Sequence, residues 1–476
     1  MAHVTRRQFL QSSLAASGAM LALNHRPSFG NVLGANDRVR VAIAGLNGRG
    51  RAHMSELAKM KDVEIAYLID PDERTYAQAV KYVKDIAGNT PQTGKDIRTA
   101  LDDKNIDAIT VATPNHWHSL MTIWACQAGK DVYVEKPCSH NVHEGRIAVE
   151  TARAHNCIVQ HGTQSRSDSR WARITAAVRA GTYGPLRVAR GLCYKKRPSI
   201  GFKKPSPPPP ELDFNIWLGP AQEQPYHDNL VHYNWHWFWE TGNGDIGNQG
   251  VHQMDIARWG IKDATLPTKV ISLGGRFGYD DQGETANTQI CLCDFGETKL
   301  IFEVRGLVDK NQVTNFFHFD DGAIRDDARF YKHGNDEGEP IPEVEYTMGP
   351  GDGNFGNFIA AVKSRKTEDL NAEILEGHYS SALGHLANVS YRLGEQAPFN
   401  KNTEIFGNDE AASETMASML DHLRKENNLK LDDMNYQLGR LLTIDPVTET
   451  CVDDEEANKL LTREYRSGFE VPTQVA

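Results

Sequence analysis

Two hydrophobic patterns divide this chain at about residue 185. From residue 38 to about 162, short apolar runs alternate with amphipathic stretches, which predicts a parallel, doubly wound sheet of the Rossmann type. The expected strands are Val39–Gly45, Glu64–Asp70, Asp107–Thr113, Asp131–Pro137 and Cys157–Gly162. The expected helices lie near residues 50–60, 72–87, 117–128 and 143–155.

Beyond residue 185, long strand-like runs follow one another without helices between them. These runs are Leu186–Lys195, Thr268–Tyr279, Ala286–Phe295 and Lys299–Leu307. Consecutive strands of this kind predict a large, mostly antiparallel open sheet. The expected fold class is therefore α/β, with an N-terminal Rossmann domain and a C-terminal α/β domain built on the second sheet.

The same patterns predict four parts along the chain. Residues 1–37 are expected to be a signal and linker, and residues 38–162 a nucleotide-binding domain. Residues 163–400 are expected to form the substrate and catalytic domain. Residues 401–476 are charged and helix-like, which predicts an extension packed on the second domain or on a neighbouring subunit.

Composition excludes two classes of partner. Lys and Arg total 52 against 63 Asp and Glu, and this net charge of −11 argues against a general nucleic-acid binder. The apolar run from Leu14 to Leu23 is too short to span a bilayer, so no integral membrane segment is expected. The seven cysteines are scattered and form no Cys-x-x-Cys pair, which favours buried free thiols over disulfides.

A glycine-rich turn follows the first expected strand. It reads Gly45-x-Asn47-x-x-Gly50, with Gly48 and Arg49 completing it, so Asn replaces the middle glycine of the usual dinucleotide-binding turn. Asn tolerates a left-handed backbone, and the helix start after the turn supplies N–H groups for a pyrophosphate. The sequence therefore predicts a dinucleotide site.

An acidic residue supports this site. Asp70 ends the second expected strand, where a carboxylate accepts a hydrogen bond from the ribose 2′-hydroxyl. The same carboxylate repels a 2′-phosphate, so the expected cofactor is NAD and NADP is disfavoured.

Two further motifs follow strands of the same sheet. One is Thr113-Pro114-Asn115-His116-Trp117-His118, and the other is Glu135-Lys136-Pro137. Ligands of open parallel sheets bind outside the carboxyl ends of the strands, so both motifs are expected at the cofactor. Its expected contacts are Gly45, Asn47, Gly48, Arg49, Gly50, Asp70, Thr113, Pro114, Asn115, His118 and Glu135. Lys136 can hydrogen-bond a reacting hydroxyl and stabilise its developing charge.

The second domain carries an aromatic and polar stretch. It begins at Trp235-His236-Trp237 and runs to a helix that contains His252 and Asp255 on one face. Histidine titrates near neutral pH, so His252 is a candidate base for a hydroxyl proton. The spacing of His232, His236 and His252 matches no tight metal site, and no metal is expected.

These motifs, in this order, resemble the Gfo/Idh/MocA family of oxidoreductases between residue 38 and about 395. The resemblance implies that Lys136 is the catalytic lysine and His252 the acid/base, in a homodimer or homotetramer. Inositol dehydrogenase-like members carry an aspartate where this chain has Asn248, and Asp245 is the candidate substitute.

The aromatic residues favour a carbohydrate substrate, because Trp and Tyr faces stack on sugar rings. The expected substrate contacts are Lys136, Trp235, His236, Asp245, Asn248 and His252.

The N-terminus predicts the compartment. Thr5-Arg6-Arg7-Gln8-Phe9-Leu10 followed by an apolar run is typical of a twin-arginine export signal, which places the protein in a bacterial periplasm. No soluble NAD pool exists there, so the cofactor is expected to be tightly bound and recycled in place.

Three functions remain open at this stage. The first is an NAD-dependent oxidoreductase that removes hydride from a ring hydroxyl carbon of a sugar, which the resemblance implies to be C3. The second is an NAD-dependent glycosidase that works by transient oxidation, elimination, water addition and re-reduction. The third is a non-catalytic sugar-binding protein on a relic fold.

Overall fold

The structure, a computed structural model, describes residues 38–399 and 409–475. The twin-arginine motif predicted at residues 5–10 lies outside these ranges. Within them, none of the helices combines the length and the apolar character that a bilayer crossing requires.

The first sheet confirms the Rossmann prediction. Its six strands have the order β3-β2-β1-β4-β5-β6, and every neighbouring pair is parallel. The strands are β1 (Val39–Ala44), β2 (Val63–Ile69), β3 (Gln92–Gly94), β4 (Ala108–Val111), β5 (Asp131–Val134) and β6 (Val159–His161). The helices between them are α2 (Arg49–Ala58), α3 (Tyr76–Ala87), α4 (Arg98–Leu101), α5 (Asn115–Gln127) and α6 (Val142–Ala154).

Helices cover both faces of this sheet, and one of them comes from far along the chain. On one face, α2 and α3 share an apolar core with α11 (Gly353–Ser364), whose Phe355 and Phe358 pack on Tyr133. On the other face, α5 and α6 share a core with Phe469 and Val471 of the C-terminal tail. The Rossmann unit is thus completed by residues beyond 350.

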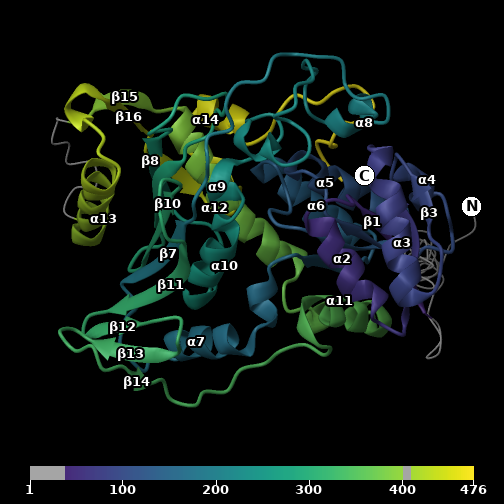
Figure 1. The fold of residues 1–476 in the computed structure, drawn as a ribbon. Helices are drawn as coiled ribbons and strands as arrows, with labels where there is room; N and C mark the ends of the chain where they lie inside the picture. The colour runs from purple at the N-terminus through teal and green to yellow at the C-terminus, as the bar shows by residue number, and fades with distance from the viewer. Residues whose placement is uncertain (1–37, 400–408, 476) are drawn as a thin grey trace, which may run out of the picture. The chain divides into compact units, whose positions relative to one another are not determined.

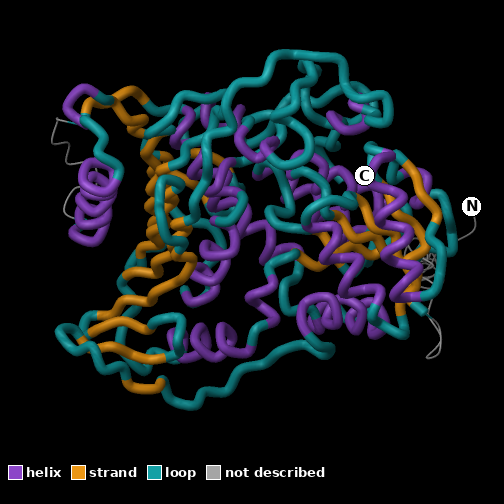
Figure 2. Tube along the Cα trace, viewed as in Figure 1, coloured by secondary structure: helices purple, strands orange, loops and turns teal. Residues whose placement is uncertain are grey.

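The second sheet is large and mostly antiparallel, as expected. It contains 12 strands, ten of them in the order β14-β13-β12-β11-β7-β10-β9-β8-β16-β15, and only the β7–β10 pair is parallel. Its strands are β7 (Val188–Tyr194), β8 (Lys269–Gly275), β9 (Thr288–Asp294), β10 (Lys299–Arg305), β11 (Gln312–Phe319), β12 (Gly322–Ile324), β13 (Arg329–Lys332), β14 (Glu339–Pro340), β15 (Glu395–Pro398), β16 (Asn435–Leu438), β17 (Leu442–Asp445) and β18 (Thr450–Cys451). Figure 2 shows the strands of the two sheets as separate groups.

Helices also lie on both faces of the second sheet. The main core lies between the sheet and the helices α10 (Gly250–Gly260) and α12 (Ile374–Arg392). Helix α13 (Glu410–Asp421) packs on the opposite face, as Figure 1 shows. The remaining helices are α7 (Ser169–Arg179), α8 (Phe214–Leu218), α9 (Gly244–Gly247) and α14 (Glu455–Leu460).

The chain after residue 409 contains more strand than its charged sequence indicates. Besides α13 and α14 it forms β16, β17 and β18, and β16 and β17 both pair with β8. The final residues then cross to the Rossmann unit, where the Phe469 ring meets the rings of Trp117 and Trp124.

A long connection, residues 195–243, links β7 to α9 and contains little regular structure besides α8 (Figure 2). Its buried aromatic residues form a small core of their own. It is bonded to the Rossmann unit through Asp213 N–H to Pro71 O (2.9 Å) and Trp117 Nε1–H to Trp217 O (3.0 Å). This 195–243 segment therefore lies over the carboxyl ends of the Rossmann strands.

Candidate functional site

A cavity of about 520 Å³ lies between the Rossmann strands and the 195–243 segment. Its lining residues come mainly from the glycine turn, from the ends of β2, β4 and β5, from the start of α5, from the 195–243 segment and from the two residues that precede α10. Of the predicted site residues, it brings together Gly45, Asn47, Gly48, Arg49, Asp70, Thr113, Pro114, Asn115, His118, Glu135, Lys136, Trp235, His236 and Asn248.

The glycine turn has the geometry that a bound pyrophosphate needs. Gly45 has φ +85°, and a Cβ there would lie 2.6 Å from the carbonyl oxygen of Ala112. A Cβ on Gly50 would lie 1.8 Å from the carbonyl oxygen of Gly45, so α2 packs directly on the turn. Asn47, Gly48 and Arg49 line the cavity, so the N-terminus of α2, where the helix dipole favours an anion, lies at the cavity wall.

Asp70 supports this turn as well as lining the cavity. Its carboxylate accepts hydrogen bonds from the backbone N–H groups of Leu46 (2.8 Å) and Asp72 (3.0 Å). Burial raises the pKa of Asp70, and the two N–H groups oppose that rise. The carboxylate can still accept a ribose hydroxyl, because each oxygen has two lone pairs.

Glu135 lies behind the cavity and joins α2 to β5. It accepts hydrogen bonds from Arg49 Nε (2.6 Å) and His53 Nε2 (3.2 Å). Burial opposes its ionisation, but His53 and Arg49 hold the pKa of Glu135 well below its usual range. A side chain predicted to contact the cofactor is thus also a structural anchor for the residue that follows it, Lys136.

Lys136 extends from the end of β5 into the cavity. Its Nζ donates to the Asn248 side-chain oxygen (2.8 Å) and to the Asn248 carbonyl (3.3 Å). Burial, together with the Arg49 and Lys195 charges, lowers the pKa of Lys136 to about 8, although Glu135 opposes the fall. Near neutral pH this amine can therefore exchange a proton.

The Thr113–His118 motif connects the two domains. Asn115 Nδ2 donates to Asn243 Oδ1 (3.1 Å). The His118 ring lies between the carbonyl oxygens of Pro137 (2.5 Å) and Thr113 (2.8 Å), and burial lowers its pKa. The neutral ring has one N–H and can donate to only one of these carbonyls. His118 thus ties the motif at β4 to the motif at β5.

Asp245 and Asn248 occupy different environments. Asp245 is buried and accepts two hydrogen bonds from Arg197, at 2.7 Å to Nε and 2.6 Å to Nη2. Lys136 therefore meets the neutral amide of Asn248, while the Asp245 carboxylate is neutralised by Arg197. Asp245 does not line the cavity, but Arg197 does.

Trp235 and His236 form a stacked pair in the cavity wall. Their rings lie 3.6 Å apart at 19°. His236 Nδ1 contacts the Tyr233 carbonyl (2.5 Å), and burial lowers the pKa of His236 to about 3. Since the neutral ring donates through Nδ1, its Nε2 is an acceptor.

His252 is not brought into the cavity lining with Lys136. It lies half-buried on α10, and burial together with the Lys136 charge lowers its pKa to about 3. Asp255, one turn along, is paired with Arg166 (3.0 Å) and Ser380 (2.7 Å). The two residues predicted to share a functional helix face therefore differ: His252 is a neutral ring, and Asp255 belongs to an ion pair with Arg166.

Several cavity residues were not predicted from the sequence. They are Lys95, Lys195, Arg197, Trp217, His232, Tyr233 and Gln249. Lys195 is the last residue of an expected strand and Arg197 lies two residues beyond it, and that basic strand end was the available signal. His232 is paired with Asp72 (2.8 Å).

Within residues 38–399 and 409–475, no three His, Cys, Asp or Glu side chains are arranged to hold a metal ion.

Two family models match the chain in the order of its domains. The oxidoreductase family NAD-binding Rossmann fold (GFO_IDH_MocA) matches residues 39–163, and the C-terminal alpha/beta domain of the same family matches residues 199–426.

Among curated proteins, the chain is similar to glycosyl hydrolase family 109 proteins. One from Shewanella baltica is 27% identical over 210 residues, which is 39% of this chain and 45% of the relative. One from Shewanella putrefaciens is 26% identical over the same length and shares. The match therefore takes in less than half of each relative.

Solved structures share the fold. The WlbA dehydrogenase from Bordetella pertussis, in complex with NADH and UDP-GlcNAcA, has a TM-score of 0.54 at 17% identity and covers 73% of this chain and 94% of its own. Levoglucosan dehydrogenase, in complex with NADH and levoglucosan, has a TM-score of 0.53 at 16% identity, with 73% and 95% covered. Taken with the two family models, the chain belongs to the Gfo/Idh/MocA family of NAD-dependent oxidoreductases.

Proposed function

We propose that this enzyme oxidises a ring hydroxyl of a sugar or glycoside, at C3 by its family resemblance, with tightly bound NAD. The observation that carries the proposal is the position of Lys136. Its amine lies in one cavity with the phosphate-binding turn on one side and the aromatic 195–243 segment on the other. Bound NAD supplies the hydride acceptor.

The residues present fit NAD. The turn from Gly45 to Gly50 brings the N-terminus of α2 to the cavity, where its dipole suits a pyrophosphate, and Asp70 is placed to accept a ribose hydroxyl. The cavity that holds these groups also contains Lys136, so the reacting hydroxyl and the cofactor site are adjacent.

Lys136 is the proton acceptor in this proposal. Its neutral amine takes the hydroxyl proton as the carbon loses hydride, and Asn248 holds the amine in place. A pKa of about 8 suits proton transfer near neutral pH, whereas His252, with a pKa of about 3, is a weaker acceptor. His252 then acts through its surroundings rather than at the reacting atoms.

The cavity wall suits a sugar ring. Trp217, Tyr233 and Trp235 offer aromatic faces, and His236 Nε2 offers an acceptor to a hydroxyl. Such walls stack on the apolar face of a pyranose while the polar groups read its hydroxyls.

The curated relatives favour a second candidate, an NAD-dependent glycosidase. Oxidation at C3 acidifies the C2 proton, and loss of that proton eliminates the aglycone. Water then adds, and the sugar is reduced again, so no net redox occurs. This cycle suits export, because the cofactor is restored within each turnover.

Aryl glycosides separate the candidates. Purified protein is incubated with them without added NAD. Aglycone release without net reduced cofactor supports the glycosidase, and a 3-keto sugar supports the oxidoreductase. If neither product forms, the enzyme proposal fails and the binding-protein alternative gains support. If Lys136→Met forms the same products at the same rate, the role proposed for Lys136 fails.

Cofactor retention and export have separate tests. We propose that denaturing the purified protein releases NAD in near-stoichiometric amount, which mass spectrometry measures, and empty protein would refute tight binding.

Replacing Arg6 and Arg7 with lysines should leave the protein in the cytoplasm. Unchanged periplasmic recovery would refute the twin-arginine route.

A further inference from the structure

We infer that the substrate carries a negatively charged group, a carboxylate or sulfate on the sugar, and that Lys195 binds it. This inference rests on the proposed sugar-oxidising function and names its substrate class. It follows from the uneven distribution of charge in the cavity.

Carboxylates line only the Rossmann side of the cavity. The two that line it are Asp70 and Glu135. Asp70 accepts backbone N–H groups and Glu135 is paired with Arg49. The lining residues after Lys136 include Lys195 and Arg197 but no Asp or Glu. The substrate side is therefore electropositive.

Two of the cavity cations lack a carboxylate partner. Lys136 Nζ donates to the amide oxygen of Asn248 (2.8 Å), and Lys195 Nζ donates to the amide oxygen of Gln249 (3.3 Å). An amide satisfies a hydrogen bond without neutralising the charge. Within 4.0 Å of either amine, the described part of the chain places no carboxylate oxygen.

The other cavity cations are neutralised, which makes the two lysines stand out. Arg49 is paired with Glu135 (2.6 Å), Lys95 with Glu73 (2.7 Å) and Arg197 with Asp245 (2.6 Å). The Lys195 charge helps to lower the pKa of Lys136, and an anion bound at Lys195 would compensate that charge. A neutral sugar would leave Lys195 with only the amide of Gln249 as its partner.

Lys195 is held in place by a network outside the cavity. Its backbone N–H donates to Arg305 O (3.0 Å). Farther along, Ser199 Oγ (3.1 Å) and Ile200 N–H (2.8 Å) both donate to Asp281. Asp281 is in turn paired with Arg276 (2.6 Å).

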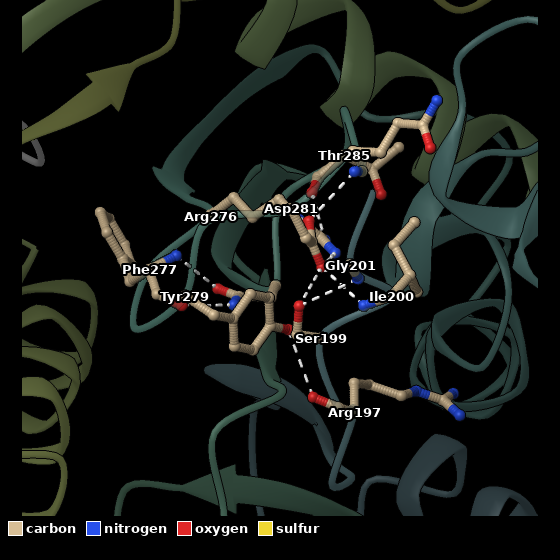
Figure 3. Close-up of polar contacts among 12 residues, drawn as sticks. Arg197, Ser199, Ile200, Gly201, Arg276, Phe277, Tyr279, Asp281 and Thr285 are labelled. Carbon is tan, nitrogen blue, oxygen red and sulfur yellow. Dashed lines mark hydrogen bonds and ion pairs between the residues drawn. The ribbon is translucent and has the colours of Figure 1, made fainter. Parts of the chain in front are cut away.

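Figure 3 shows the contacts of Asp281 with Ser199, Ile200 and Arg276, and the Arg197 side chain points away from them. The Arg197 carbonyl accepts a hydrogen bond from Tyr279 OH (3.2 Å), while its guanidinium reaches Asp245. The segment that follows β7 is therefore anchored on its outer side and presents Lys195 and Arg197 to the cavity.

Binding of matched glycosides to the NAD-loaded protein tests the inference. The probes are methyl glucuronide against methyl glucoside, the equivalent galacto and manno pairs, and glucose 6-sulfate against glucose, measured by calorimetry. We expect the acidic member of at least one pair to bind about tenfold more tightly, and added salt to reduce that preference. A carboxylate and a sulfate are distinguished by which pairs show it.

Lys195→Gln should remove most of the preference and change binding of the neutral member by less than about twofold. Lys196→Gln is the matched control, since that side chain is 66% exposed and lies by Asp309 (3.7 Å). The inference is overturned if no pair shows a preference for the acidic member, or if Lys195→Gln weakens both members equally.

The two proposals fail in different ways. Lys136-dependent oxidation of neutral glycosides without any preference for acidic ones would remove the inference and keep the proposed function. Lys195-dependent binding of acidic glycosides without any oxidised product would keep the anion site and remove the proposed function.

Discussion

Lys136 carries a charge in a half-buried position and donates a hydrogen bond to a neutral partner, Asn248. Burial and the neighbouring cations Arg49 and Lys195 lower its pKa, and Glu135 limits the fall. A proton-exchanging amine in this cavity makes the fold less stable, because its charged form is poorly solvated there.

Replacing Lys136 with Met should therefore raise stability while abolishing turnover. We expect a fall in kcat/KM of at least about 100-fold and a gain of about 1–2 kcal/mol in the free energy of unfolding at pH 7. Because the folded-state pKa of Lys136 is depressed, the gain is complete below about pH 8 and fades towards pH 10.5. Chemical denaturation across this pH range measures it.

The wild-type enzyme supplies the matching kinetic profile. In the oxidation direction, kcat/KM should rise with pH through about 8, because Lys136 must be neutral to accept the proton. A rate that falls as pH rises through 8 would show that the protonated amine is the active form and would contradict the role proposed for Lys136.

Asp70 should set the cofactor preference. Asp70→Ala removes the acceptor of the Leu46 and Asp72 N–H groups and the charge that repels a 2′-phosphate. We expect weaker NAD binding and at least about tenfold less discrimination against NADP, measured by titrating both into stripped protein. Asp85→Asn, an exposed ion pair with Lys81 on α3, is the control. Unchanged discrimination would remove Asp70 from this role.

Side chains that directly follow a strand could be predicted from the sequence. Side chains held in place by residues far away in the sequence could not. Lys136 and Asn248 were both predicted, and they contact each other. Arg197 was missed because its pairing with Asp245 joins residues 48 positions apart, and no local pattern records such a pair.

At the scale of elements, the turn between β1 and α2 depends on direct contact of backbone with backbone. Gly50→Ala would place a methyl group 1.8 Å from the Gly45 carbonyl, so α2 must move off the turn. We expect destabilisation by about 3 kcal/mol or more and loss of bound NAD, measured by thermal unfolding and cofactor content.

Gly88→Ala provides the control for the backbone alone. Gly88 caps α3 with φ +79°, and a Cβ there meets nothing within 4 Å. This variant should lose about 1 kcal/mol and retain NAD. Equal NAD loss in both variants would show that the effect is not specific to the phosphate-binding turn.

The anchor in Figure 3 should stabilise the segment after β7. Asp281→Asn removes the charge that Arg276 and the Ile200 N–H require, with an expected cost of about 2–4 kcal/mol near neutral pH. Burial raises the pKa of Asp281, but Arg276 holds it below its usual range. The contribution of Asp281 to stability is therefore complete above the pKa of an unfolded aspartate and is lost as pH falls through the lower pKa of the folded state.

Asp280→Asn, at the exposed neighbouring position, should leave unfolding unchanged. An equal response of the two variants in urea unfolding would show that the anchor contributes nothing specific.

The elements that the sequence predicted are those with a clear local period. Alternating strands and helices revealed the Rossmann sheet, and continuous apolar strands revealed β7 to β10. The short strands from β12 onward carry too few residues for a period, and β16 to β18 lie in a charged stretch whose apolar side chains are sparse.

At the scale of the whole molecule, the described residues, 38–399 and 409–475, form one compact unit. Helix α11 and the C-terminal tail return to the Rossmann sheet, and the 195–243 segment spans its carboxyl edge. The hydrophobic pattern alone does not predict that these segments pack back on the Rossmann sheet, because the apolar faces that meet there are hundreds of residues apart in the sequence. Of these three parts, only the 195–243 segment contributes described residues to the cavity lining.

The most direct test of the central claim uses NAD-loaded protein and methyl glycosides labelled with deuterium at C3. The absorbance of reduced nicotinamide is followed in a single turnover across acidic and neutral sugars. The account predicts reduction by at least one glycoside, slower reduction by its deuterated form, and none with Lys136→Met. Absence of reduction with every sugar, or equal rates from labelled and unlabelled forms, would contradict oxidation at C3 in this cavity.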